Sequence, residues 1–345
     1  MNSRERVQAV LAGKVPDRVP VCLHNSHMAA AEAGISMAQY RQDPQAVAKA
    51  HLTALEKHGQ DSLYLTIDTA LLAEAMGAEA EYRDNEPAKV VAPAIRSLDE
   101  VDRLKVADPL ADGRLPVLVE ATELVAKQVG EEVAVRAGAD QGPFDLPCLV
   151  LGIENFLTAL ACDPDHPGIQ TLMSVCYESH LALHRALVKA GAHYTSSGES
   201  LAGPDVVSPA MYERFARPLQ EKMVKELAAD GIFTVVHICG DTTRILNSLA
   251  EYDYCGFELD QKTDAGMAKQ TVGAGHVLFG NVDPSGVLAL GTPGLVREKT
   301  RELISIWKPG AQFVLNSGCA LPSSTPAENI RAFLETAHEF GVYEE

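Results

Sequence analysis

The sequence predicts a single (β/α)8 barrel, and three observations support this prediction. The chain has 345 residues, about twice the usual size of a domain, which fits either two ordinary domains or one large α/β barrel. Short β-rich runs alternate with longer helical patterns along the whole chain, as βα units around a parallel sheet do. No composition break, low-complexity linker or internal repeat marks a boundary. We therefore expect residues 1–345 to form one domain.

Eight segments have the composition of buried strands, because they are short, apolar and rich in β-branched or aromatic residues. They are Arg18 to Leu23, Ser62 to Ile67, Val133 to Ala137, Tyr194 to Ser197, Phe233 to His237, Gly256 to Leu259, His276 to Phe279 and Gln312 to Asn316. Eight strands that are each followed by a helix favour a barrel over a doubly wound sheet.

The predicted helices lie between these strands, and several have a proline at or near the first turn, where a missing N–H costs no hydrogen bond. They include Pro44 to His58, Leu115 to Gln128, Pro167 to Ala190, Pro209 to Ala229, Thr242 to Glu251 and Pro326 to Phe340. The segment from Gly77 to Leu104, after the second strand, is predicted to leave the barrel. Within it, Glu79 to Arg83 and Lys89 to Val91 look like short edge strands around a turn at Asn85.

The charge balance excludes some ligand classes. The chain has 29 Lys and Arg against 47 Asp and Glu, and the net charge of −18 repels phosphate backbones and anionic lipid. No apolar stretch reaches the roughly 18 to 20 residues of a spanning helix, and the first residues lack the apolar region of a signal peptide. We therefore expect a cytoplasmic protein with no nucleic-acid or membrane partner.

The seven cysteines are odd in number and irregularly spaced, so they do not form a disulfide framework. In a reducing compartment a cysteine is a small buried residue, a metal ligand or a nucleophile. Four of them lie in apolar runs without a paired histidine and are predicted to be core residues: Cys148, Cys162, Cys176 and Cys255.

Barrel enzymes have their active site where strands end and βα loops begin. The fifth predicted strand leads into His237-Ile238-Cys239, and alternation along a strand sends both chemically active side chains the same way. The eighth strand is followed by Cys319 at the same end of the barrel. One imidazole and two thiolates form a three-ligand zinc site with an open fourth position. On these residues alone, buried small cysteines and a hydrogen-bonded core histidine are the favoured interpretation.

Seven segments, in order along nearly the whole chain, resemble the uroporphyrinogen decarboxylase superfamily. They are RERVQAVLAGKVPDRVPV from Arg4, AEAMGAEAEY from Ala73, GPF from Gly142, SPAMYERF from Ser208, HICGD from His237, GNVDP from Gly280 and NSGCALPSSTPAENI from Asn316. The resemblance implies a barrel fold with its site at the strand ends.

Two departures from the decarboxylases are visible within this resemblance. Decarboxylases resemble one another in an arginine-bearing segment after the first strand, where this chain has Cys22-Leu23-His24-Asn25-Ser26-His27 and no arginine. They also have a histidine where Cys319 stands. Without guanidinium groups, nothing would hold the many carboxylates of a porphyrinogen.

The set of His237, Cys239 and Cys319 is instead similar to the zinc pattern of the methylcobamide:coenzyme M methyltransferases. This resemblance implies Zn²⁺ as the cofactor, a small-molecule thiol as methyl acceptor, and a methylcobamide supplied by a partner corrinoid protein. Zinc makes chemical sense, because it deprotonates a thiol that is only slightly ionised near pH 7. Coenzyme M, whose sulfonate calls for a cationic subsite, is one candidate acceptor. Another thiol or a pterin is the alternative.

Glu258, near the end of the sixth predicted strand, is a candidate fourth zinc ligand when no thiol is bound. The alternative is a carboxylate that points to solvent or to Lys262.

Other polar residues that follow strands are candidates for binding substrate, and each has an ordinary structural alternative. For the histidines it is loop polarity, and for the carboxylates it is capping of the next helix. These candidates are His24, His27, Asp68, Asp140, Gln141 and Glu199.

The sequence therefore predicts a zinc-dependent methyltransferase that acts from a methylated corrinoid to a thiol. One alternative is a decarboxylase of a porphyrinogen or of a smaller carboxylic acid, which would need carboxylate-binding arginines and no metal. The other is a non-catalytic protein that binds a corrinoid or a thiol.

Overall fold

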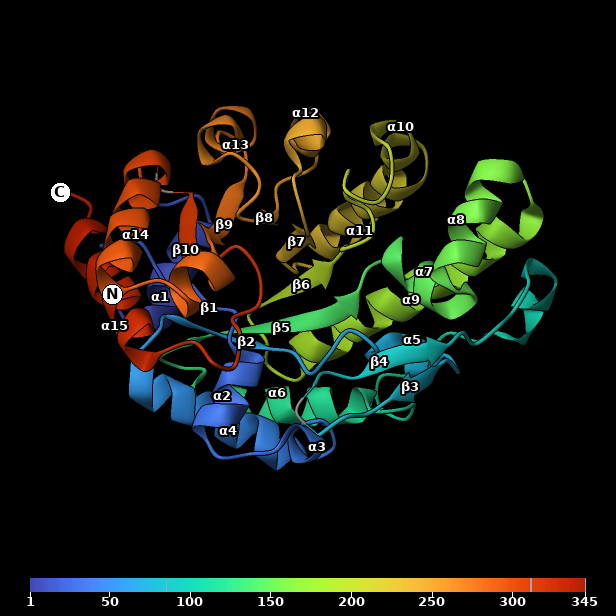
Figure 1. Cartoon of the computed structure of the whole chain (residues 1–345), viewed down its shortest axis with the longest axis horizontal. Coiled ribbons are helices and arrows are strands. Elements are labelled where there is room, and N and C mark those ends of the chain that lie inside the picture. The colour runs from blue at the N-terminus through green and yellow to red at the C-terminus, as the bar shows by residue number, and fades with distance from the viewer. Residues whose placement is uncertain (85, 311, 345) are drawn as a thin grey trace.

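A parallel barrel forms the centre of the computed structural model, which describes residues 1–84, 86–310 and 312–344. Its eight strands follow the order β1-β2-β5-β6-β7-β8-β9-β10, and a parallel bridge between Val21 and Leu315 brings the first and last strands together (Figure 1). The strands are β1 (Cys22–Leu23), β2 (Ser62–Leu65), β5 (Ala134–Gln141), β6 (Tyr194–Gly198), β7 (Thr234–Ile238), β8 (Gly256–Leu259), β9 (Val277–Val282) and β10 (Phe313–Ser317). The predicted fold class is confirmed.

Helices surround this sheet (Figure 1). The α-helices are α1 (Ser3–Leu11), α2 (Ser26–Glu32), α3 (Met37–Tyr40), α4 (Pro44–His58), α5 (Leu71–Ala75), α6 (Leu115–Val129), α7 (Asp145–Leu151), α8 (Ile153–Cys162), α9 (Pro167–Lys189), α10 (Pro209–Met211), α11 (Arg217–Ala229), α12 (Leu246–Leu249), α13 (Ala265–Thr271), α14 (Pro293–Trp307) and α15 (Ala327–Phe340). Shorter turns are the 3-10 helices η1 (Leu98–Arg103) and η3 (Thr243–Ile245) and the π-helical turns η2 (Tyr212–Ala216) and η4 (Pro284–Ala289).

The barrel has two apolar layers. The larger cluster of buried side chains joins the outer face of the strands to the helices. The smaller cluster takes side chains from almost every strand and from α1, so it fills the barrel interior. Its members are Val7, Val10, Cys22, Tyr64, Ala134, Tyr194, Val235, Val277, Phe279 and Val314. Strands buried on both faces explain the continuous apolar runs in the sequence.

Two predicted elements differ from the structure for local reasons. The first strand begins at Cys22 rather than Arg18, and Pro20, which has no N–H to donate, contributes only its carbonyl oxygen to Leu315. The helix predicted from Pro209 is divided by the π-helical turn η2 before α11. Pro218 is the second residue of α11 and has no backbone N–H. A continuous α-helix would therefore lack the hydrogen bond from this residue to the preceding turn.

The predicted excursion is present. Strands β3 (Glu79–Glu81) and β4 (Lys89–Ala92) form an antiparallel pair outside the barrel (Figure 1). The predicted turn at Asn85 lies outside the described residues.

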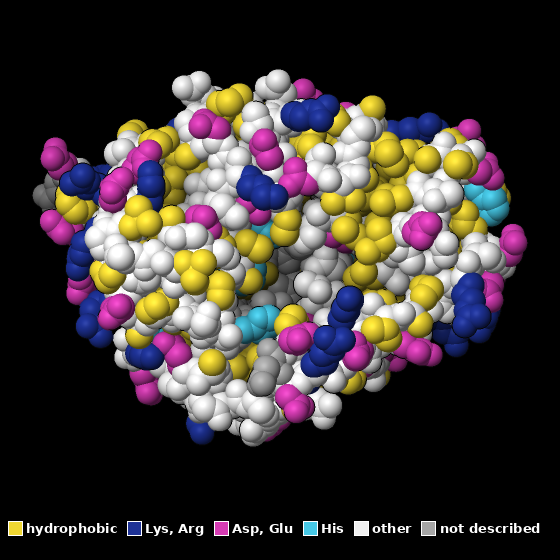
Figure 2. Space-filling view, viewed as in Figure 1, with side chains coloured by type: hydrophobic (Ala, Val, Ile, Leu, Met, Phe, Trp, Pro, Cys, Tyr) yellow, Lys and Arg dark blue, Asp and Glu magenta, His cyan; other side chains and the backbone are white. Residues whose placement is uncertain are grey.

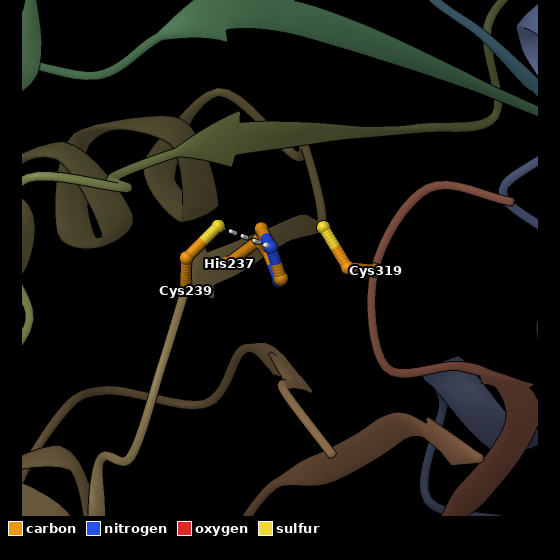
Figure 3. A group of neighbouring side chains, drawn as sticks. All are labelled: His237, Cys239 and Cys319. Atoms are coloured by element: carbon orange, nitrogen blue, oxygen red, sulfur yellow. Dashed lines mark hydrogen bonds between the residues drawn. The ribbon is translucent and has the colours of Figure 1, made fainter. Parts of the chain in front are cut away.

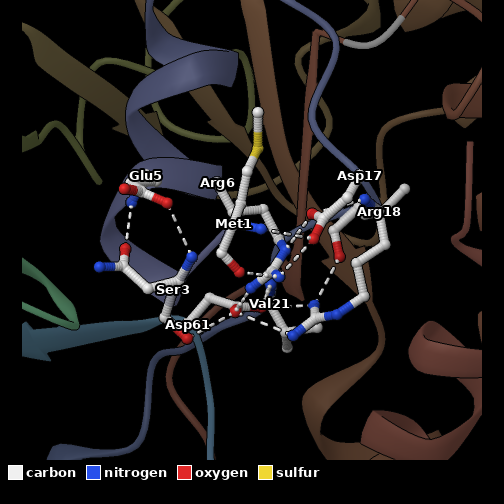
Figure 4. Close-up of polar contacts among 10 residues, drawn as sticks. Met1, Ser3, Glu5, Arg6, Asp17, Arg18, Val21 and Asp61 are labelled. Carbon is white, nitrogen blue, oxygen red and sulfur yellow. Dashed lines mark hydrogen bonds and ion pairs between the residues drawn. The ribbon is translucent and has the colours of Figure 1, made fainter.

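An ion cluster joins α1 to the N-terminal end of the barrel (Figure 4). Asp61, directly before β2, has no exposed surface and accepts hydrogen bonds from Arg6, from Arg18 and from the backbone N–H of Val21. Arg6 also pairs with Asp17. The N-terminal motif of the family resemblance therefore serves stability, because it lies at the end of the barrel opposite the strand ends that carry the site.

Among the described residues, no single helix combines the length and apolar character needed to cross a membrane. The pair α7 and α8, bent by 110° at their junction, meets that test together.

Candidate metal centre

Three side chains from two distant parts of the chain meet at the C-terminal end of the barrel. His237 is the fourth residue of β7, Cys239 follows directly after that strand, and Cys319 lies in the loop after β10. One ligand atom from each lies within 4.8 Å of the other two, and the side chains point toward one another (Figure 3). Strands β7 and β10 are not neighbours, because β8 and β9 lie between them in the sheet. The curvature of the barrel brings their C-terminal ends together.

The spacing of the group fits a small tetrahedral cation. His237 Nε2 lies 3.2 Å from Cys239 Sγ. Ligand atoms around zinc lie roughly 3.5 Å apart if the Zn–S and Zn–N distances are about 2.3 and 2.1 Å. His237 Nδ1 lies 2.9 Å from the carbonyl oxygen of Glu258, which can only accept a hydrogen bond. Nδ1 therefore carries the proton, and Nε2 is the nitrogen available to a metal.

The pKa values in this group also favour the binding of a cation. Hydrogen bonding with the Cys319 thiol and the charge of His237 outweigh burial and lower the pKa of Cys239 to about 3, while the pKa of Cys319 is raised. Burial alone would lower the pKa of His237, but the adjacent Cys239 thiolate raises it to about 10. The lowered pKa of Cys239 favours its thiolate form, which is the form that binds a metal ion.

Glu258, the predicted fourth ligand, does not join this group. Its carboxylate has almost no exposed surface, and its two oxygens are engaged by Arg136 and by His24 Nδ1, the latter at 3.1 Å. Burial alone would raise the pKa of Glu258, but the Arg136 charge and the contacts with His24 and His237 together hold it below its usual range. The solvent alternative is also wrong, because Lys262 pairs with Asp205 instead. The reason is that Glu258 faces the barrel interior, where it meets a buried guanidinium.

Arg136 is a residue that the sequence reasoning missed. It lies fully buried in β5, and its guanidinium carbon is 4.0 Å from the centre of the Tyr64 ring. The available signal was an arginine within the apolar run from Val133 to Gly138, because an arginine is almost never fully buried unless it is paired.

A cavity of about 190 Å³ opens beside the three ligands. Figure 2 shows a hollow near the middle of this face, with histidine side chains at its edge. The cavity is lined by five of the six predicted substrate-binding residues, which are His24, His27, Asp68, Asp140 and Gln141. The ring centre of His24 lies 6.5 Å from that of His237.

Asp68 and Asp140 both line the cavity and accept hydrogen bonds at the start of α5. Asp68 accepts a hydrogen bond from the N–H of Ala70, and Asp140 accepts one from the N–H of Leu72, both at the start of α5. Asp68 also receives two hydrogen bonds from Arg114, whose guanidinium is almost buried. Both carboxylates therefore support the start of α5 while they line the cavity.

Glu199, the sixth predicted residue, lies behind the cavity wall. Strand β6 ends at Gly198, and Glu199 is fully buried with Oε2 accepting a hydrogen bond from the N–H of Asp145 at 3.2 Å. Burial raises the pKa of both carboxyl groups, that of Asp145 to about 8. The prediction of a substrate contact at Glu199 is corrected, because its side chain points toward Asp145. Its neighbour Ser200 lines the cavity instead, with Oγ 3.3 Å from Cys239 Sγ.

The remaining cysteines are free thiols, and Cys148, Cys176 and Cys255 are buried as predicted. The prediction of a core position is wrong for Cys162, which ends the outer helix α8 and is exposed.

The chain is similar to a known family, to curated relatives and to a solved structure. The family model described as uroporphyrinogen decarboxylase (URO-D) matches residues 2–340. The chain is 28% identical over 343 residues to a methylcobamide:CoM methyltransferase, MtaA, of Methanosarcina barkeri, with 98% of each chain covered. It is 26% identical over 344 residues to a uroporphyrinogen decarboxylase of Syntrophotalea carbinolica, with 94% of this chain and 95% of the relative covered. A solved structure, a methyltransferase from Methanosarcina mazei, superposes with a TM-score of 0.90 at 24% identity and covers 99% of each chain.

Proposed function

The chain belongs to the uroporphyrinogen decarboxylase family, and we propose that within it the protein is a zinc-dependent methyltransferase that moves a methyl group from a methylated corrinoid to a thiol. The observation that carries this proposal is the convergence of His237, Cys239 and Cys319 beside a small cavity. Two sulfurs and one nitrogen are the ligands that zinc prefers, and three protein ligands leave a position for a substrate atom.

Each part of the group has a role in this function. His237, Cys239 and Cys319 would hold the metal, and the carbonyl of Glu258 fixes the tautomer of His237. Zinc held there would supply a positive charge that lowers the pKa of the acceptor thiol and fixes its sulfur. The acceptor thiolate would attack the methyl carbon of the methylated corrinoid, so that an S–C bond would form while the Co–C bond would break with its electron pair left on cobalt. The thiol proton would go to solvent.

We assign Glu258 a positioning role in place of the fourth-ligand role. Its carboxylate holds His24 at the cavity wall and is itself held by Arg136. The two oxygens would have to leave these partners to reach a metal. The open position therefore stays free for the acceptor.

The methyl donor is proposed to arrive on a separate corrinoid protein. Relatives at 26 to 28% identity are named methylcobamide:CoM methyltransferases, which supports a corrinoid as donor. The partner protein and a cytoplasmic location stay predictions.

A decarboxylase is the weaker candidate. Among the described residues that line the cavity, there is no arginine or lysine to hold a substrate carboxylate. The cavity of about 190 Å³ is also below the usual range of about 300 to 1,000 Å³ for drug-sized ligands, and a porphyrinogen is larger still.

The test is methyl transfer from methylcobalamin to 2-mercaptoethanol by the zinc-loaded protein under anaerobic conditions, followed by the loss of methylcobalamin absorbance. We expect turnover that stops with a chelator and is lost in Cys239→Ala. A rate no higher than that of free zinc would overturn the proposal. Tight zinc binding without turnover would favour the binding-protein alternative.

A further inference from the structure

The cavity wall formed by the segment after β2 and by the end of β5 differs in charge from what an anionic acceptor requires. Asp68, Asp140 and Gln141 lie on this wall, and among the described lining residues no arginine or lysine faces them. The histidines of the cavity do not supply the missing charge, because burial lowers the pKa of both His24 and His27. A sulfonate or carboxylate would therefore meet no cation among the described residues that line the cavity.

The guanidinium that contacts this wall, that of Arg114, is already neutralised. Arg114 donates from Nη1 to Asp68 at 2.7 Å and from Nε to Glu74 at 2.8 Å. Its side chain is about 9% exposed, and it faces two carboxylates. A second anion would have to displace one of these two carboxylates, which leaves that carboxylate unpaired.

Asp140 indicates which kind of ligand group this wall would bind. It is 7% exposed, and it is held in the left-handed region at a φ of 63°, which is uncommon for a residue other than glycine. Its Oδ2 accepts the N–H of Leu72 at 2.8 Å, while Oδ1 has no hydrogen-bond partner. A buried carboxylate oxygen without a partner is costly, and an N–H donor brought into the cavity would satisfy it.

We propose that the methyl acceptor is a small thiol whose tail carries an ammonium group, recognised by Asp140 and Gln141. This inference rests on the proposed function, because it takes the acceptor sulfur to lie at the His237, Cys239 and Cys319 group. The sulfur would then occupy the metal end of the cavity, and the ammonium would lie at the wall formed by the end of β5. The volume of about 190 Å³ suits a two- or three-carbon spacer between them.

Three thiols that differ only in the tail separate these possibilities. They are 2-aminoethanethiol, 2-mercaptoethanol and 2-mercaptoethanesulfonate, which carry positive, neutral and negative tails on the same two-carbon spacer. Their binding to the zinc-loaded protein is measured by calorimetry at pH 8, above the raised pKa of Asp140 of about 7, and without methyl donor, so the readout does not depend on turnover. We expect the aminothiol to bind about tenfold tighter than 2-mercaptoethanol, as for a hydrogen bond to a charged group, and the sulfonate to bind weakest.

Two variants assign the preference to the wall. Asp140→Asn should lower the affinity for the aminothiol to that of 2-mercaptoethanol and leave the latter unchanged. Asp68→Asn, which releases Arg114, should improve the affinity for the sulfonate. Asp102→Asn, which removes the same charge from an exposed position, should change none of the three affinities.

The outcomes distinguish this inference from the proposed function. Tightest binding of the sulfonate, or equal binding of all three thiols, would overturn the inference and leave the methyltransferase proposal standing. Failure of every thiol to bind the zinc-loaded protein would overturn both. The ranking is measured on the unaltered protein, so it decides the matter even if a variant fails to fold.

Discussion

The carbonyl oxygen of Glu258 lies 2.9 Å from Nδ1 of His237, and this contact directs Nε2 of His237 toward the two cysteines. The same residue holds His24 through its carboxylate. One position on β8 therefore fixes both a candidate metal ligand and a wall of the cavity. The backbone of Glu258 orients the ligand, and its side chain acts on the surroundings of the site.

Replacing Cys319 by alanine should remove zinc from the protein with little loss of stability. Two ligands hold zinc far more weakly than three, whereas barrel packing does not depend on the metal. Elemental analysis should give about one zinc per chain for the unaltered protein and almost none for the variant. Cys162→Ala is the matched control, because Cys162 is an exposed thiol on α8. Full zinc content in Cys319→Ala would show that the ligand assignment is wrong.

Breaking the ion pair between Arg136 and Glu258 should destabilise the barrel strongly. Both side chains are fully buried, and removing one partner leaves an uncompensated charge in the interior. We expect Arg136→Met to lower the free energy of unfolding by about 3 to 5 kcal/mol. Urea unfolding of Arg136→Met, Glu258→Gln and the double variant forms a cycle, and the double variant should recover part of the loss. Strictly additive losses would contradict direct coupling.

The barrel can be predicted from the sequence because its strands are buried on both faces and therefore appear as apolar runs, as in Val235 and Val236 of β7. It also brings His237, Cys239 and Cys319 to one end, since strand ends meet there in every barrel of this kind. The partner of Glu258 could not be predicted in the same way. Arg136 lies 122 positions away, and which side chains meet across the interior depends on how the strands are staggered around the barrel.

Asp140 should make stability depend on pH between about 4 and 7. Burial raises its pKa to about 7, with the Asp68 charge adding to the rise and Arg114 opposing it. The unfolded value is about 3.9, so the folded state binds more protons in this interval and stability falls as the pH rises through it. Asp140→Asn cannot titrate. It should therefore gain stability over the unaltered protein as the pH rises, by up to about 4 kcal/mol above pH 7.

Thermal or urea unfolding at pH 4.5 and pH 8 measures this gain, and the difference between the two proteins is the quantity to compare. Other titrating groups contribute equally to both proteins and cancel. A difference that does not change with pH would contradict the assignment of a raised pKa to Asp140.

The ion cluster at the N-terminal end should affect stability and leave the metal site unchanged. Asp61→Ala leaves Arg6 and Arg18 without their buried partner, and we expect a loss of about 3 to 5 kcal/mol. Asp17→Asn should cost at most about 1 kcal/mol, because the Asp17 side chain is 44% exposed. Urea unfolding measures both, and zinc content should equal that of the unaltered protein. Loss of zinc in Asp61→Ala would mean that the two ends of the barrel are coupled.

The most direct test of the central claim is zinc X-ray absorption of the zinc-loaded protein, before and after 2-mercaptoethanol is added. If His237, Cys239 and Cys319 form an open site for a thiol, zinc has two sulfur ligands and one imidazole before addition and a third sulfur afterwards. A sulfur count that stays the same after addition would contradict the claim that this group activates a thiol. A zinc ion bound without sulfur would contradict the site itself.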